Sequence, residues 1–187
     1  MTRQENLLHK TTRLAKPHQQ EKYCLTSADD PLFDYHKAIA SNDLDTVKQL
    51  LPTCDNERAM DVAAMHNSIE ILMYLHKFST KGCTTRSMDY AAAFGHFECM
   101  RFLHQFRTEG CSRQALLYAA CKGHLECVLY LWRNQPRPNW FDLEQAICFA
   151  KDNKHHHVVK ALNAFVDHTN GGWKRFTTSI QKKLLLV

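Results

Sequence analysis

The chain lacks the short motifs by which catalytic and metal-binding proteins are usually recognised. Its 187 residues contain no glycine-rich phosphate loop, no G-x-S-x-G nucleophile elbow and no H-E-x-x-H zinc motif. Eight cysteines are present, but no two are spaced as C-x-x-C, the usual signature of a zinc knuckle or a redox pair. We therefore expect no catalytic residue, no cofactor and no bound metal ion.

Long apolar segments are also missing. The mean hydropathy is −0.44, and no segment approaches the roughly 20 apolar residues that a membrane-spanning helix needs. Residues 1–6, M-T-R-Q-E-N, lack the apolar region of a secretory signal. These absences predict no transmembrane segment and a location in the cytoplasm, with the nucleus as the alternative. In that setting the cysteines are expected to be reduced, buried thiols.

The middle of the chain has no net positive charge. The net charge is +5, but five Lys/Arg against two Glu give residues 1–22 a charge of +3. Four Lys/Arg without any acid give residues 171–187 a charge of +4, so residues 23–170 carry −2. Because a nucleic-acid groove gains most of its affinity from Lys and Arg, no nucleic acid is expected as a partner.

What the chain does have is a pattern that repeats at a fixed period. The segments that begin at positions 60, 88 and 116 read M-D-V-A-A-M-H-N, M-D-Y-A-A-A-F-G and L-L-Y-A-A-C-K-G, so the period is 28 positions. Such a period is typical of stacked supersecondary units. Apolar residues spaced i, i+3, i+4 predict two short helices in each unit, and the paired alanines predict close packing between neighbouring units. In the third unit, hydroxyl side chains within 83–87, such as that of Thr84, can cap the start of the first helix, and Met88, Ala91 and Ala92 form its apolar face. Gly95 suits the left-handed backbone that ends this helix.

Two segments carry a resemblance to a known family. Residues 91–103, A-A-A-F-G-H-F-E-C-M-R-F-L, and residues 119–131, A-A-C-K-G-H-L-E-C-V-L-Y-L, resemble the ankyrin-repeat pattern T-P-L-H-x-A-A-x-x-G-H-x-E-x-V-x-x-L-L. The linker R-T-E-G-C-S at 107–112 is similar to that of short ankyrin arrays in large DNA viruses, amoebae and oomycetes. Here R-S-M-D replaces T-P-L-H, and the period is shorter than the family's usual period of about 33. Since the missing residues belong to the projecting β-hairpin, we expect tight turns and almost no strand.

The resemblance implies an all-α fold: an ankyrin-repeat solenoid of about five helix-turn-helix units with little or no β-hairpin, plus a C-terminal capping helix. The repeat domain is expected to span 31–170, and Asn42 and Asn153 take the glycine position in the degenerate first and last units. The predicted units are about 33–54, 55–82, 83–110, 111–138 and 139–168.

The two flanks are predicted separately. Residues 1–30 are polar, with little periodicity, and are expected to be largely disordered. Residues 171–187 place apolar residues at helical spacing between lysines and arginines, which predicts a basic amphipathic helix. We favour a cap over the last repeat; the alternative is a helix that binds a partner or a membrane surface.

In ankyrin repeats the two residues before the glycine line the concave face. The corresponding residues here are Ala40, Ser41, Met65, His66, Ala93, Phe94, Cys121, Lys122, Lys151 and Asp152. The resemblance therefore implies a non-catalytic module, expected to be a monomer, that binds a partner protein of unknown identity through this face. Phe94 is the leading candidate for a binding hot spot, because an exposed aromatic residue has no packing reason to be there.

Two other functions stay open. The chain could be an adaptor or localisation factor whose basic C-terminal helix or C-terminus docks to another protein or a membrane surface. An enzyme or zinc protein rests only on the His and Cys content, and consecutive helix positions such as His155, His156 and His157 cannot converge on one ion. His96 and His124 open the second helices as part of the repeat pattern and are expected to make turn-closing hydrogen bonds.

Overall fold

The computed structural model describes residues 31–134 and 141–169. These residues form ten α-helices and no β-strand, so the predicted all-α solenoid with almost no hairpin is confirmed. The helices are α2 (Pro31–Ala40), α3 (Leu44–Cys54), α4 (Arg58–Met65), α5 (Ile69–Phe78), α6 (Thr85–Phe94), α7 (Phe97–Phe106), α8 (Gln114–Lys122), α9 (Leu125–Arg133), α10 (Leu143–Asp152) and α11 (His156–Thr169). None of the helices in these ranges is both long and apolar enough to cross a membrane. The segments 1–30 and 171–187, for which disorder and a capping helix are predicted, lie outside the described residues.

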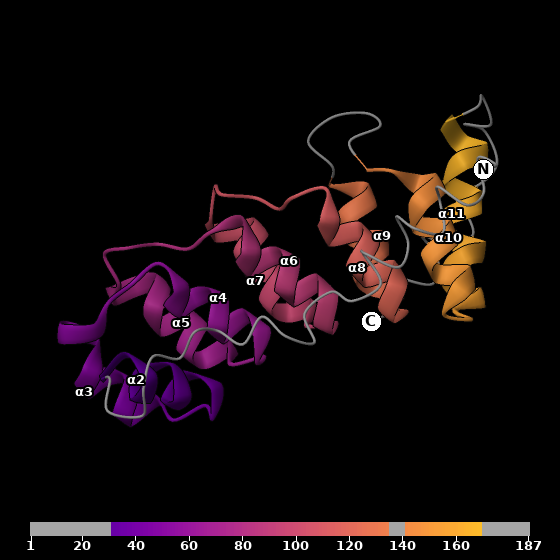
Figure 1. Cartoon of the computed structure of the whole chain (residues 1–187). Helices are drawn as coiled ribbons and strands as arrows, with labels where there is room; N and C mark the ends of the chain where they lie inside the picture. Colours follow the sequence, from indigo (N-terminus) through magenta and orange to yellow (C-terminus); the bar gives the residue numbers. More distant parts are fainter. Residues whose placement is uncertain (1–30, 135–140, 170–187) are drawn as a thin grey trace, which may run out of the picture.

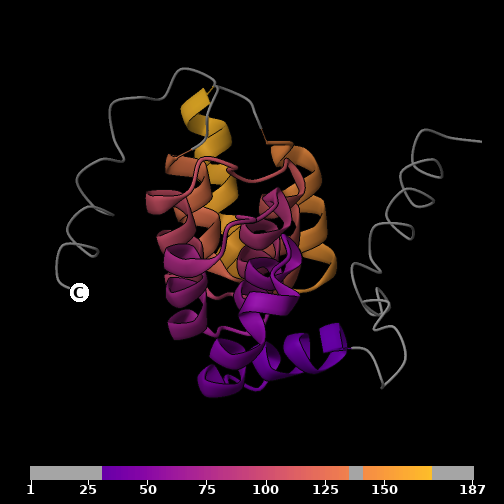
Figure 2. The same cartoon turned by 90° about the vertical axis from the view of Figure 1, so that its left-hand side faces the viewer.

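The helices alternate between two layers (Figure 1). The even-numbered helices α2 to α10 stack side by side as an inner layer, and the odd-numbered helices α3 to α11 form an outer layer. Figure 2 shows the layers as two columns. Neighbouring inner helices lie closer together than neighbouring outer helices, which puts the inner layer on the concave side of the stack.

The local sequence explains where each helix begins and ends, as the third unit illustrates. Thr84 precedes α6, and its hydroxyl accepts a hydrogen bond from the backbone N–H of Arg86 at 3.1 Å. Ala91 and Ala92, on the predicted apolar face, have no exposed surface. Gly95 then adopts φ = +75°, the left-handed backbone that ends a helix and turns the chain into α7. Each of these local predictions is confirmed.

The alanine pairs form the contact between neighbouring inner helices. They are Ala63 and Ala64, Ala91 and Ala92, and Ala119 and Ala120, and all six are fully buried. A methyl side chain lets two helix axes approach to the lower end of the usual spacing of about 8–10 Å. Bulkier residues of the outer helices fill the space behind these pairs and are also fully buried; they are Leu72, Met100 and Val128, which occupy equivalent positions in successive units.

The last unit departs from the predicted register by one residue. Asn42 adopts the left-handed conformation in the first unit, with φ = +58°, as its place in the pattern predicts. In the last unit, however, the left-handed residue is Lys154, with φ = +62°, and not Asn153. The Asn153 side chain instead donates to the carbonyl of Phe149 at 2.8 Å, at the end of α10. His155 therefore corresponds to the histidine that follows the glycine in the two preceding units.

Candidate protein-binding surface

The residues predicted for the concave face lie at the C-terminal ends of the inner helices. In the first four units the first member of each pair is partly or fully buried; these residues are Ala40, Met65, Ala93 and Cys121. The second member is exposed in every unit; these residues, which we call the inner row, are Ser41, His66, Phe94, Lys122 and Asp152. Lys151, the first member in the last unit, is exposed as well. The inner row and Lys151 are therefore the exposed part of the predicted set.

Phe94 is the large apolar residue of the inner row. Its side chain is 39% exposed at the end of α6. The ring stacks on that of His96, with 6.0 Å between centroids and 16° between planes. This contact orients the Phe94 ring while leaving much of the ring exposed to solvent. A ring that is already oriented loses less freedom when a partner binds.

The histidines that follow the glycines connect neighbouring units. His96 places Nε2 3.0 Å from the carbonyl oxygen of Met65 in the preceding unit, and His124 hydrogen bonds to the backbone of Ala93 in the same way. The backbone N–H of each histidine also closes the turn before it, donating to Ala91 at 2.8 Å and to Ala119 at 2.9 Å, as predicted; the contact of the ring with the preceding unit was not predicted. Burial lowers the pKa of both rings, so they are neutral near pH 7. Their role is to join the units that carry the inner row.

Two aspartates make further contacts between units that the sequence analysis missed. Asp61 is buried and accepts hydrogen bonds from the Thr84 backbone N–H at 3.1 Å, the Thr84 hydroxyl at 2.7 Å and the Ser87 hydroxyl. Asp89, at the equivalent position of the next unit, accepts from the backbone N–H of Ser112 at 2.8 Å. Both carboxylates cap the start of the next unit and are withdrawn from the surface. Their spacing of one period was the signal that could have revealed them.

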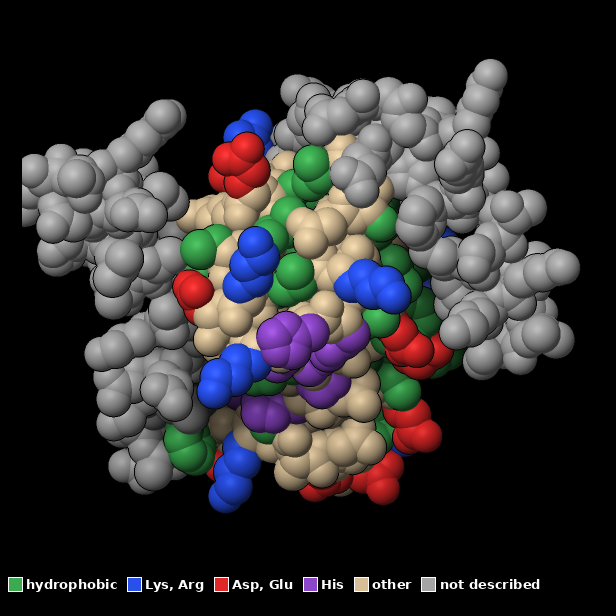
Figure 3. All heavy atoms as spheres, turned by 90° about the vertical axis from the view of Figure 1, so that its right-hand side faces the viewer, with side chains coloured by type: hydrophobic (Ala, Val, Ile, Leu, Met, Phe, Trp, Pro, Cys, Tyr) green, Lys and Arg blue, Asp and Glu red, His purple; other side chains and the backbone are tan. Residues whose placement is uncertain are grey.

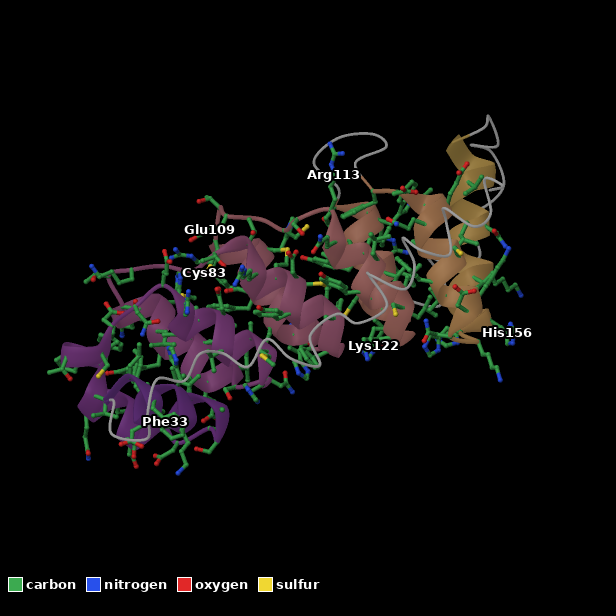
Figure 4. The ribbon with its side chains drawn as sticks, viewed as in Figure 1. Phe33, Cys83, Glu109, Arg113, Lys122 and His156 are labelled. Atoms are coloured by element: carbon green, nitrogen blue, oxygen red, sulfur yellow. The ribbon has the colours of Figure 1, made fainter. Side chains whose placement is uncertain are left out.

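A run of histidines, 155–157, lies at the end of the array, where Figure 3 shows histidine side chains gathered beside lysine or arginine side chains. The rings of His155 and His157 are 6.0 Å apart, and His157 Nε2 lies 3.0 Å from the carbonyl oxygen of Gly123. In Figure 4, Lys122 and His156 lie on one edge of the stack, and Cys83 and Glu109 lie on the opposite edge. Across the described ranges, no group of three or more His, Cys, Asp or Glu residues is arranged to hold a metal ion.

Exposed large apolar side chains also occur on the outer layer, where the sequence pattern did not predict them. Met73 and Phe78 of α5 and Phe106 of α7 are each about half exposed. Phe78 and Phe106 occupy equivalent positions in neighbouring units, one period apart. The Phe106 ring packs against that of Phe102 with 4.9 Å between centroids. Phe106 thus resembles Phe94 in exposure and aromatic support but lies on the other layer.

Stacked helix pairs joined by hydrogen bonds between units define a helical repeat protein. Comparison with protein families matches part of this stack: residues 88–131, which run from α6 into α9, match the model described as ankyrin repeats (many copies). Residues 88–131 thus carry ankyrin repeats, and the helix pairs on either side of the matched segment continue the same stack. No curated protein matches the chain.

Proposed function

We propose that the chain is a non-catalytic binding module whose protein partner lies across the inner row. Ankyrin repeats generally serve as protein-interaction modules. The observation that supports this surface is the contrast between fixed and variable positions. The buried alanines recur in successive units, whereas the exposed residue of the inner row changes from Ser to His, Phe and Lys over the first four units. A constant scaffold with a variable exposed row is suited to selective binding. We further propose that the protein acts as a monomer in the cytoplasm or the nucleus.

Phe94 is the proposed anchor because it lies at the centre of the inner row, between His66 and Lys122. Truncating an aromatic anchor at an interface costs on the order of 2 kcal/mol, which is about a thirtyfold weaker Kd. The same truncation should change the free energy of unfolding by less than about 1 kcal/mol, because the side chain is already 39% exposed. Binding and stability should therefore separate at this residue.

The test uses a displayed library of random peptides selected on the full-length chain. Peptides recovered on the native protein are then titrated against Phe94→Ala and against Phe106→Ala, the same substitution in the same unit but on the outer layer. We expect the first variant to lose most of the affinity and the second to keep it, with equal thermal stability for all three proteins. Peptides that bind all three equally, or that depend only on Phe106, would overturn the proposal.

A further inference from the structure

The outer layer of each unit contacts the next unit through the eighth residue of its helix. His104, the eighth residue of α7, lies edge-on to Tyr130 of α9 with 5.4 Å between ring centroids. Trp132, the eighth residue of α9, stacks on Phe165 of α11 with 4.8 Å between centroids. In α11 the eighth residue is Asn163, which is exposed and has no ring. The last helix of the described chain therefore lacks the aromatic side chain that would continue the outer layer.

The first residue of each outer helix follows the same trend. In α5, α7 and α9 it is a large apolar residue that is partly buried against the core; these residues are Ile69, Phe97 and Leu125. α11 instead begins with His156, which is exposed. His156, Lys160 and Asn163 are spaced i, i+4 and i+7, so they form one stripe along α11, and all three are exposed. This polar stripe takes the place of residues that join the other units.

A polar stripe at the end of a stack already suits contact with water, so the array does not need a further helix to cover it. The charge of the last unit gives a basic segment no reason to pack there either. Among the described side chains of 141–166, three exposed cations are balanced by three exposed acids; they are Lys151, Lys154 and Lys160, and Asp142, Glu144 and Asp152. Figure 3 looks onto this end of the array and shows Lys or Arg side chains around a group of histidines. Segment 171–187, with a charge of +4, would therefore find no net attraction on the last unit.

The sequence of segment 171–187 suits a different surface. Its large apolar residues recur at intervals of three or four positions, which places them on one face of a helix; they are Trp173, Phe176, Ile180, Leu184 and Val187. Lys174, Arg175, Lys182 and Lys183 supply four positive charges, and the segment contains no acid. An apolar face with Trp and Phe, combined with cations outside it, is typical of a helix that lies in the interface of an anionic bilayer. Charges of one sign match a surface that is negative throughout, whereas a groove on a protein requires a particular arrangement of side chains.

We propose that segment 171–187 holds the array on an anionic lipid surface and that the last unit ends the stack without it. The polar stripe of α11 removes the need for a cap, and the segment supplies both the apolar and the cationic contribution that lipid binding requires. The two contributions act together, because stable attachment to a bilayer takes more than one signal. The inner row is not part of this contact, so the array can bind its protein partner while it is attached.

Cosedimentation of the full chain with vesicles tests the lipid contact. The native chain should bind vesicles of phosphatidylcholine that contain about 30% phosphatidylserine, but not vesicles of phosphatidylcholine alone, and added salt should weaken the binding. Each Lys or Arg near an anionic surface contributes about a fivefold gain in affinity, so Lys182→Ala/Lys183→Ala should weaken binding by about thirtyfold. Lys77→Ala/Arg101→Ala is the matched control, since it removes two exposed cations from the outer layer and should keep the affinity within about threefold. Phe94→Ala should bind vesicles as the native chain does, which keeps this test separate from the proposed function.

A triple variant of the full chain distinguishes the lipid surface from a cap. Trp173→Ser/Phe176→Ser/Ile180→Ser removes most of the apolar face of the segment. Vesicle binding should then fall by more than about tenfold, while the midpoint of urea unfolding, measured without lipid, should stay unchanged. A lower midpoint in this variant would show that the segment packs on the last unit as a cap, and the proposal would be wrong.

Three further results would also refute the lipid contact. Equal binding to vesicles with and without phosphatidylserine would remove the role of the cations. An equal loss in Lys77→Ala/Arg101→Ala would attribute the effect to the total charge of the chain. No binding to the anionic vesicles, together with an unchanged midpoint in the triple variant, would leave another protein as the partner of the segment.

Discussion

Replacing Gly95 by alanine should destabilise the array through a contact between units as well as through its own backbone. Gly95 has φ = +75°, where an L-residue costs about 1–2 kcal/mol. A Cβ at this position would lie 2.5 Å from Nδ1 of His124 in the next unit and within 3.0 Å of two further atoms of the same ring. That ring is held by its hydrogen bond to the backbone of Ala93 and cannot move aside freely.

The chain contains a matched control for the backbone part of this cost. Gly110 has φ = +70°, and a Cβ built there meets no atom within 4 Å. Gly110→Ala should therefore lose only the left-handed penalty of about 1–2 kcal/mol. Overpacking against His124 adds about 1–3 kcal/mol at Gly95. Gly95→Ala should consequently lose about 2–5 kcal/mol in total, clearly more than the control.

The assay is urea unfolding of the full chain followed by far-UV circular dichroism, with His124→Ala completing a double-mutant cycle. Removing the ring should cost stability by itself, but Gly95→Ala on that background should then cost no more than Gly110→Ala. A coupling energy of about 1–3 kcal/mol is expected. Equal losses at the two glycines, or no relief from His124→Ala, would refute the proposed contact. An unchanged m-value would show that the same cooperative unit unfolds in each variant.

Two further predictions concern the contacts between units. Burial lowers the pKa of His96 and His124 below the 6.5 of an unfolded chain, so the unfolded state binds protons more readily. The free energy of unfolding should be level above about pH 7.5 and should fall as the pH drops through about 6.5. His96→Gln removes one of the two rings and should make this fall less steep. An unchanged slope in the variant would contradict a lowered pKa of His96 as its cause. Asp61→Ala leaves the hydrogen-bond donors of Thr84 and Ser87 without their acceptor, so the free energy of unfolding should fall by about 2–4 kcal/mol. A fall below about 1 kcal/mol in the same urea assay would show that the array does not need this cap.

The parts of the fold that depend on neighbours along the chain were predictable. The cap at Thr84, the buried alanine pair 91–92 and the left-handed Gly95 all followed from residue type and helical spacing, and the structure has them as predicted. The left-handed residue of the last unit did not follow from the pattern. Asn153 and Lys154 are adjacent, and the pattern favours the asparagine. The choice between them depends on the stack, since the His155 ring of the last unit packs against Gly123 of the unit before it.

The candidate surface was predictable in place but not in detail. The resemblance predicted two positions per unit for the concave face, such as Ala93 with Phe94 and Cys121 with Lys122. The sequence could not show that the first member of each of these pairs, Ala93 or Cys121, is buried, because the residues that cover it belong to a neighbouring unit. Hydrogen bonds from His96 and to Asp61 also cross between units, and a one-dimensional pattern does not specify their partners.

The sequence by itself thus determined the helix pairs, their number and their order, because a fixed period and apolar spacing encode local structure directly. Only the tertiary structure decided which charges share a surface. Asp61 and Asp89 count as negative charges in the composition of the chain, yet the stacking of the units buries them as caps, whereas Arg58 and Arg86 stay exposed. The physical reason is that burial is imposed by the neighbouring unit, so the charge of a face follows from the stack and not from the sum over the chain.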